Sequence, residues 1–153
     1  MRKVSMNMER ANDFNTVDEM FTLLKLISKY YDKLCKMFDI TQVQIEVLYW
    51  LYTSKDNTVK MSTIGDKLEM ARSGVTILVD RMALAGLVKR RPDREDRRII
   101  NLIITEKGCN IMNEIFPGNE VFRVSPLDFL EREEKEVLNK LIIKIKEKIE
   151  MKI

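Results

Sequence analysis

Apolar residues recur at three- and four-residue steps along the first quarter of the chain. Between residues 14 and 38 they include Phe14, Leu24, Ile27 and Phe38. This spacing keeps one face of a helix apolar, and it persists for about seven turns. Because so long a helix seldom buries its whole stripe against one small domain, we expect a second subunit to cover part of it.

A second helix is predicted from Thr41 to about Tyr52. Thr41 and Gln44 match a capping box, in which the hydroxyl accepts a backbone N–H and the glutamine side chain reaches back. Trp50 is expected to anchor the core. The inward positions are predicted to be Val43, Val47, Leu48 and Leu51.

Two short helices joined by a tight turn are predicted next. Ser62 is expected to cap the first helix, which ends before the turn at Met70-Ala71. The second helix runs from Arg72 to Ala85 and is closed by Gly86. Its apolar face consists of Val75, Leu78, Val79 and Met82. The arrangement is typical of a helix-turn-helix.

A strand, a charged tip and a second strand follow immediately. The strands are predicted at residues 87–91 and 99–105, and a one- or two-residue strand is expected within residues 59–61. The basic residues of the hairpin are Lys89, Arg90, Arg91, Arg94, Arg97 and Arg98, and its acids are Asp93, Glu95 and Asp96. A helix-turn-helix followed by such a hairpin outlines a winged helix.

Two further helices complete the chain. Thr105 is expected to cap a helix from Glu106 to about Phe116, which residues 117–119 break or kink. The last helix begins at Glu131, and its apolar stripe is Val137, Leu138, Leu141, Ile142, Ile145 and Ile149. The predicted fold class is therefore mainly α with a small β-hairpin wing, an α+β winged helix-turn-helix flanked by dimerisation helices.

The composition of the chain excludes several kinds of catalytic and metal site. The chain has 153 residues, a formal net charge of +3 and no histidine, which removes histidine-based catalysis and zinc sites containing histidine. The acids lie scattered among lysines, so we expect no enzyme, no metal and no cofactor. A polar N-terminus and the lack of long apolar runs predict a cytoplasmic protein without membrane contact. Cys35 and Cys109 are expected to be reduced, and a redox role for either is not favoured.

Residues 71–105 have a chemistry suited to duplex DNA. A helix fits the major groove, where the residues near its N-terminus reach base edges. Arg72 is suited to guanine, Ser73 and Thr76 can bond to base or phosphate, and Ile77 offers an apolar contact. Arginines on a protruding hairpin can enter a narrow minor groove. Asp96, beside two arginines, is expected to brace the wing instead of touching DNA.

These residues resemble the MarR family of bacterial transcription regulators. The resemblance rests on Thr41-Gln-x-Gln, Val75-Thr-x-Leu-Val-Asp-Arg-Met82, Gly86-Leu-Val, Asp93-x-x-Asp-Arg-Arg98 and Thr105-Glu-Lys-Gly108. It implies one MarR-type domain over 1–153, with a winged lobe at 41–108 and dimerisation helices at 10–38 and 109–153. It also implies a homodimer on a pseudo-palindromic operator, with a small aromatic or amphipathic effector bound between helices and lobe.

The expected function is that of a homodimeric, sequence-specific repressor of transcription, released from double-stranded DNA by a small molecule. The alternative is a winged-helix module that binds proteins without specific DNA binding. The predicted DNA-binding residues are Ser62, Thr63, Arg72, Ser73, Gly74, Thr76, Ile77, Arg81, Arg94, Arg97 and Arg98, and Asp96 is the predicted brace.

Overall fold

The computed structural model describes residues 2–116 and 129–152, with side chains described from Phe14 onward. The helices are α1 (Arg2–Phe38), α2 (Gln42–Tyr52), α3 (Met61–Leu68), α4 (Arg72–Leu84), α5 (Glu106–Ile115) and α6 (Arg132–Glu150). The strands are β1 (Thr58–Lys60), β2 (Val88–Pro92) and β3 (Ile100–Ile104), and a 3-10 turn spans Lys55–Asn57. The fold is mainly helical with one small antiparallel sheet, as predicted. The expected break at residues 117–119 lies outside the described residues.

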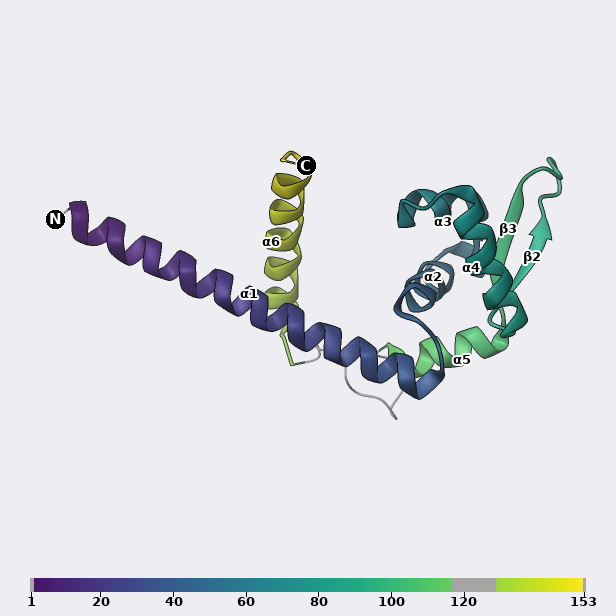
Figure 1. Cartoon of the computed structure of the whole chain (residues 1–153), viewed down its shortest axis with the longest axis horizontal. Coiled ribbons are helices and arrows are strands. Elements are labelled where there is room, and N and C mark those ends of the chain that lie inside the picture. The colour runs from purple at the N-terminus through teal and green to yellow at the C-terminus, as the bar shows by residue number, and fades with distance from the viewer. Residues whose placement is uncertain (1, 117–128, 153) are drawn as a thin grey trace.

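The first helix leaves the rest of the chain as a long rod (Figure 1). It begins at Arg2, well before the predicted start near Phe14. Residues 2–13 lack an apolar stripe but contain neither glycine nor proline, and most favour helices. Nothing in their chemistry therefore ends the helix, which extends beyond the region that periodicity identifies.

Helix α2 begins with the predicted capping box. The Thr41 N–H donates to Gln44 Oε1 at 2.8 Å, and the Gln44 N–H donates to Thr41 Oγ1 at 3.3 Å. The prediction that Val43 faces inward is wrong, because its side chain is exposed while Ile45 is buried. Val43 lies in the first turn, at the edge of the side that the rest of the helix buries.

The sheet has the order β1-β3-β2, so β3 is the central strand. Val88 pairs with Ile104 and Pro92 with Ile100 across the hairpin, while Lys60 pairs with Asn101 on the other edge. That pairing explains why the predicted cap at Ser62 is wrong. The chain passes directly from Lys60, the last residue of β1, into α3 at Met61, so Ser62 already lies inside the helix and caps nothing.

The core fills the space between α2, α4, α5 and the sheet. Leu48, Val79, Met82, Leu102 and Met112 are fully enclosed. The predicted cap at Thr105 is confirmed, since its hydroxyl accepts the Gly108 N–H at 3.2 Å.

Close packing explains the glycine at position 108. A Cβ on Gly108 would lie 2.6 Å from both Ile104 Cγ1 and the Leu87 carbonyl oxygen. A side chain there would collide with the sheet, so α5 packs directly against it.

Helix α6 begins where it was predicted and stands apart from the winged lobe (Figure 1). The Glu131 N–H donates to the Glu134 carboxylate at 2.9 Å, which completes a capping box. The apolar side chains of α6 face solvent in the single chain, with Leu141, Ile142 and Ile145 about half exposed. Among the described helices, none is both long and apolar enough to cross a membrane.

Candidate nucleic-acid interface

Helix α4 docks through the apolar face that the sequence predicts. Val75, Val79 and Met82 are buried, and Leu78 packs partly against them. The turn before it is closed by Glu69, which adopts a left-handed φ of 51°. A Cβ on Gly65 would lie 3.2 Å from Val75 Cγ2, so this glycine lets α3 approach α4 closely. The docking fixes which face of α4 is left for solvent.

The solvent-facing side of α4 carries most of the DNA-binding residues that were predicted for this helix. Arg72, Ser73, Thr76, Ile77 and Arg81 are exposed. The Thr76 hydroxyl donates to the Arg72 carbonyl at 2.9 Å within the helix. In the free protein this hydroxyl is therefore already used as a donor, and its lone pairs remain available as acceptors.

Gly74 and the two α3 residues have different surroundings. Gly74 is half-buried, and a Cβ there would lie 3.0 Å from the methyl carbon of Met70. This gives the glycine a packing reason of its own at the turn. On α3, Ser62 is exposed and Thr63 is half-buried.

An arginine of the wing is tied back to α4. The Arg90 guanidinium forms an ion pair with Asp80 and donates to the Thr76 carbonyl at 3.2 Å. This link was not predicted from the sequence. The sequence did contain a hint, because Asp80 lies on a helix that is expected to meet DNA. A carboxylate there needs a cationic partner to offset its repulsion by the phosphates. The partner could not be chosen from spacing alone, since it lies on a separate strand.

The tip of the wing is folded around Asp93. Its Oδ1 accepts the backbone N–H groups of Glu95 at 3.0 Å and Asp96 at 3.4 Å. Its Oδ2 accepts from Asn101 Nδ2 at 2.9 Å, and Asn101 is a buried polar residue of β3. The Asn101 hydrogen bond, followed by the two backbone bonds, holds the pKa of Asp93 below its ordinary value. Sequence reasoning missed both Asp93 and Asn101 as organisers of the tip.

Asp96 holds Arg98 through both carboxylate oxygens. Arg98 Nε donates to Oδ1 and Nη2 donates to Oδ2, each at 2.9 Å, and the Arg98 backbone N–H also donates to Oδ1 at 3.0 Å. The side-chain bond lowers the pKa of Asp96, and the same bond raises the pKa of Arg98. Both groups therefore stay charged at neutral pH, and the arginine has a defined direction.

The other wing arginines are not held in this way. Arg94 and Arg97 are exposed, and neither side chain forms a hydrogen bond or an ion pair within the part of the chain that the structure describes. Their cationic groups remain available to an external anion.

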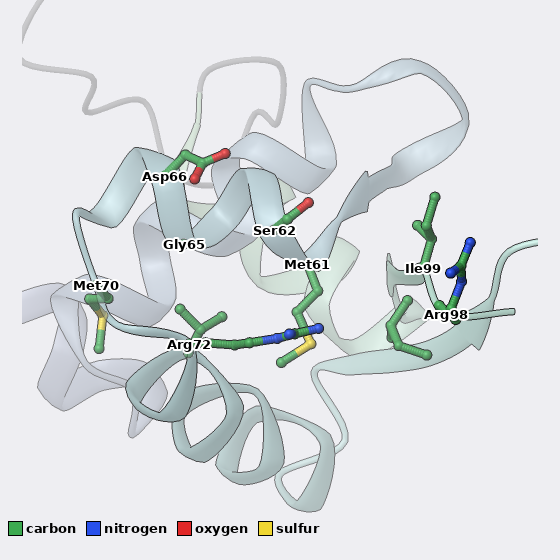
Figure 2. Close-up of a pocket in the computed structure, with 10 residues that line it drawn as sticks. Met61, Ser62, Gly65, Asp66, Met70, Arg72, Arg98 and Ile99 are labelled. Atoms are coloured by element: carbon green, nitrogen blue, oxygen red, sulfur yellow. The ribbon is translucent and has the colours of Figure 1, made fainter. Parts of the chain in front are cut away.

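A hollow of about 390 Å³ brings predicted residues of three elements together. Ser62 of α3, Arg72 of α4 and Arg98 before β3 line it, with Met61 and Met70 as apolar walls. Figure 2 shows Arg72 reaching from the start of α4 toward Met61, with Arg98 and Ile99 on the wing side. The sequence could not predict this hollow, because it depends on how the wing packs beside α3.

The cysteines and the candidate metal chemistry give no competing site. Burial, followed by the nearby Asp32, raises the pKa of the half-buried Cys35 thiol, which lowers its thiolate fraction. Among residues 14–116 and 129–152, whose side chains the structure describes, no cluster of three or more Cys, Asp or Glu residues could hold a metal ion.

Helix α3, a tight turn, helix α4 and the β2–β3 hairpin together define a winged helix-turn-helix. A family model described as MarR family matches residues 38–99. The HTH-type transcriptional repressor MdtR of Bacillus subtilis (strain 168) is 33% identical over 95 residues, which make up 62% of this chain and 60% of that protein. The chain thus aligns with about three fifths of the length of this curated relative.

Similar solved structures cover more of the chain than the sequence relative does. AbsC, a MarR family transcriptional regulator from Streptomyces coelicolor, matches with a TM-score of 0.67 at 25% identity, covering 85% of this chain and 88% of AbsC. Reduced AbfR bound to DNA matches with a TM-score of 0.61 at 25% identity, covering 97% of this chain and 99% of the AbfR chain. The family model, the sequence relative and these structures show that the chain is similar to MarR-family regulators, most closely in its winged helix-turn-helix.

Proposed function

We propose that this protein is a sequence-specific regulator of transcription that binds duplex DNA through α4 and the wing. One observation carries the proposal. Asp80, Asp93 and Asp96 are each neutralised or hydrogen-bonded within the protein, whereas Arg94 and Arg97 have no internal partner in the described chain. The surface formed by α4 and the wing therefore offers cations to a polyanion while its aspartates are already occupied.

Each element has a distinct role in this proposal. The N-terminal half of α4 enters the major groove, and the wing reaches the neighbouring minor groove or its phosphates. Asp96 braces Arg98 and does not touch DNA. The proposed DNA-binding residues are Ser62, Thr63, Arg72, Ser73, Gly74, Thr76, Ile77, Arg81, Arg94, Arg97 and Arg98.

The proposal includes a homodimer. In the single chain, α1 exposes Phe14 at 74%, Phe21 at 59% and Leu24 at 61%, and α6 exposes Ile142 at 53% and Ile149 at 51%. Exposing so much apolar surface to water is unfavourable. In the proposed dimer, residues 10–38 and 109–153 of each copy would cover the same segments of the other copy. A two-fold dimer presents two α4 helices, so its operator would be a pseudo-palindrome with half-sites about one helical turn apart, roughly 34 Å.

Release by a small aromatic or amphipathic effector completes the proposal. Four aromatic side chains lie where α1, α2 and the end of α5 meet. Tyr30 and Tyr31 have ring centres 5.8 Å apart, and those of Tyr49 and Phe116 are 5.0 Å apart. Burial, followed by the charge of Glu46, raises the pKa of Tyr31, as expected for a phenol in a partly apolar setting. A ligand bound there would contact both the dimerisation helices and the winged lobe.

Selection of bound sequences from a random duplex pool tests the proposal. The full chain should enrich a pseudo-palindromic sequence, and affinity for that duplex should fall steeply with salt. As a matched control, a scrambled duplex of the same composition should bind more weakly than the selected duplex at each salt concentration. If no sequence is enriched and no duplex is retained at low salt, the proposal fails and a protein-binding winged helix becomes the better explanation.

A further inference from the structure

The middle of the outer face of α4 is apolar. Ile77 is 54% exposed, although the rest of the α4 apolar side chains near it pack inward. Ile77 lies one turn after Ser73 and one turn before Arg81, because four residues advance an α-helix by about one turn. It therefore occupies the centre of the face proposed to enter the major groove.

The polar groups beside Ile77 are already bonded within the protein. The Thr76 hydroxyl donates to the Arg72 carbonyl at 2.9 Å. The Thr76 carbonyl and the Asp80 carboxylate both accept from Arg90. None of these groups is an unused donor. Besides the acceptor lone pairs of the Thr76 hydroxyl, the centre of the outer face of α4 therefore offers the methyl groups of Ile77.

The base edges of the major groove contain one apolar group, the C5 methyl of thymine. A β-branched side chain in a helix is nearly fixed about χ1, so Ile77 would present its methyl groups with little loss of conformational freedom. A G·C pair at the same place would lose water from its donors and acceptors without gaining a partner from Ile77.

We propose that Ile77 determines specificity by packing against the C5 methyl of one thymine in each operator half-site. This inference rests on the proposed function and adds the identity of one base pair to it. It excludes hydrogen-bonded readout at that base pair by the side chain at position 77.

Replacing thymine with deoxyuridine tests the contact, because the exchange removes the methyl group and leaves base pairing intact. Each thymine of the selected operator is replaced in turn, and binding of the full chain is measured by fluorescence anisotropy. One position in each half-site should weaken binding by about fourfold, as expected for one buried methyl group. The remaining thymines serve as internal controls.

Three variants assign the effect to the side chain. Ile77→Ala should bind the thymine and deoxyuridine operators almost equally, whereas Ile77→Val should keep most of the difference. Leu84→Ala is the matched control, because Leu84 lies two turns further along the same helix face and is 91% exposed. It should retain the full fourfold difference of the parent protein.

An operator that tolerates deoxyuridine at every position would overturn this inference and leave the proposed function intact. The same sensitivity in Ile77→Ala as in the parent would also overturn it. A random pool without any enriched sequence would overturn both. The deoxyuridine scan with the unaltered protein decides the question even if a variant fails to fold.

Discussion

At the scale of single residues, the wing sorts its charged groups into two kinds. Arg90 forms an ion pair with Asp80, and Arg98 forms one with Asp96, so the charge of each arginine is partly neutralised within the protein. Arg97 follows Asp96 directly, yet has no partner in the described chain. Adjacent arginines of identical chemistry therefore have different tasks, and substitution can separate them.

Arg97→Ala should weaken operator binding by about tenfold and reduce the salt slope by about one, because it removes a cation that we propose to contact DNA. The melting temperature should stay unchanged, since the side chain makes no contact within the described fold. Anisotropy titrations at several salt concentrations measure the binding effect. Lys55→Ala removes an exposed cation from the 3-10 turn and should leave both affinity and slope as they are.

Asp96→Asn should weaken operator binding by roughly threefold to tenfold, although it makes the protein more positive. The reason is that Arg98 loses its two-pronged partner and no longer has a fixed direction. Glu95→Gln is the matched control, because it removes the same charge from the neighbouring position. Tighter binding by Asp96→Asn, equal to that of Glu95→Gln, would show that Asp96 only repels DNA.

At the scale of elements, α4 and the wing act as one unit because Arg90 joins them. The ion pair itself contributes little to folding, since Arg90 and Asp80 are 33% and 56% exposed. Its larger effect is to hold β2 beside the recognition helix. The two elements that we propose to contact DNA would then reach adjacent grooves in a fixed relation.

A double-mutant cycle on Asp80→Asn and Arg90→Gln tests this coupling. Each single variant should lower the free energy of unfolding by less than about 1 kcal/mol, because the pair is exposed. Operator affinity should fall more in either single variant than stability does. The double variant should lose less than the sum of the two losses, and strict additivity would argue against the coupling.

Gly108→Ala should lower the free energy of unfolding by about 1–3 kcal/mol, because the new Cβ would meet the Leu87 carbonyl and Ile104. Gly74→Ala is the matched control within a helix. Its Cβ would meet the flexible end of Met70, so the change should be neutral or slightly stabilising. Urea denaturation of both variants checks the difference.

Local signals explain what the sequence could predict of these elements. Thr41, Gln44 and Thr105 bond to residues three positions away, so their caps could be predicted before the fold was known. Ser62 has the right chemistry for a cap, but the pairing of Lys60 with Asn101 starts the helix earlier. The Arg90–Asp80 pair and the Asn101–Asp93 bond depend on tertiary packing, and periodicity carries no information about them.

At the scale of the whole molecule, the most prominent feature is the exposed apolar surface of α1 and α6. They lie outside the winged lobe, in helices that are long enough to pair with another copy (Figure 1). Dimerisation would fix the distance between the two α4 helices. The spacing of the operator half-sites would therefore be set by residues that never touch DNA.

Ile145→Glu should break the proposed dimer, because it places a charge in the apolar stripe of α6. Sedimentation equilibrium should show a shift toward monomer, and operator affinity should fall by more than tenfold as the second half-site is lost. Ile143→Glu makes the same substitution about 200° around the helix and should be tolerated. Equal disruption by both variants would indicate a different packing of α6.

Hydroxyl-radical footprinting of the selected operator tests the central claim most directly, because the radical attacks sugars along the minor groove. We expect two symmetric protected minor-groove segments, one beyond each major-groove half-site. The Arg97→Ala protein at saturating concentration should lose protection in those segments. A parallel dimethyl sulfate reaction should still show guanine N7 protected in the major groove. Minor-groove protection that is unchanged in Arg97→Ala, or absent from the parent complex, would contradict the assignment of the wing.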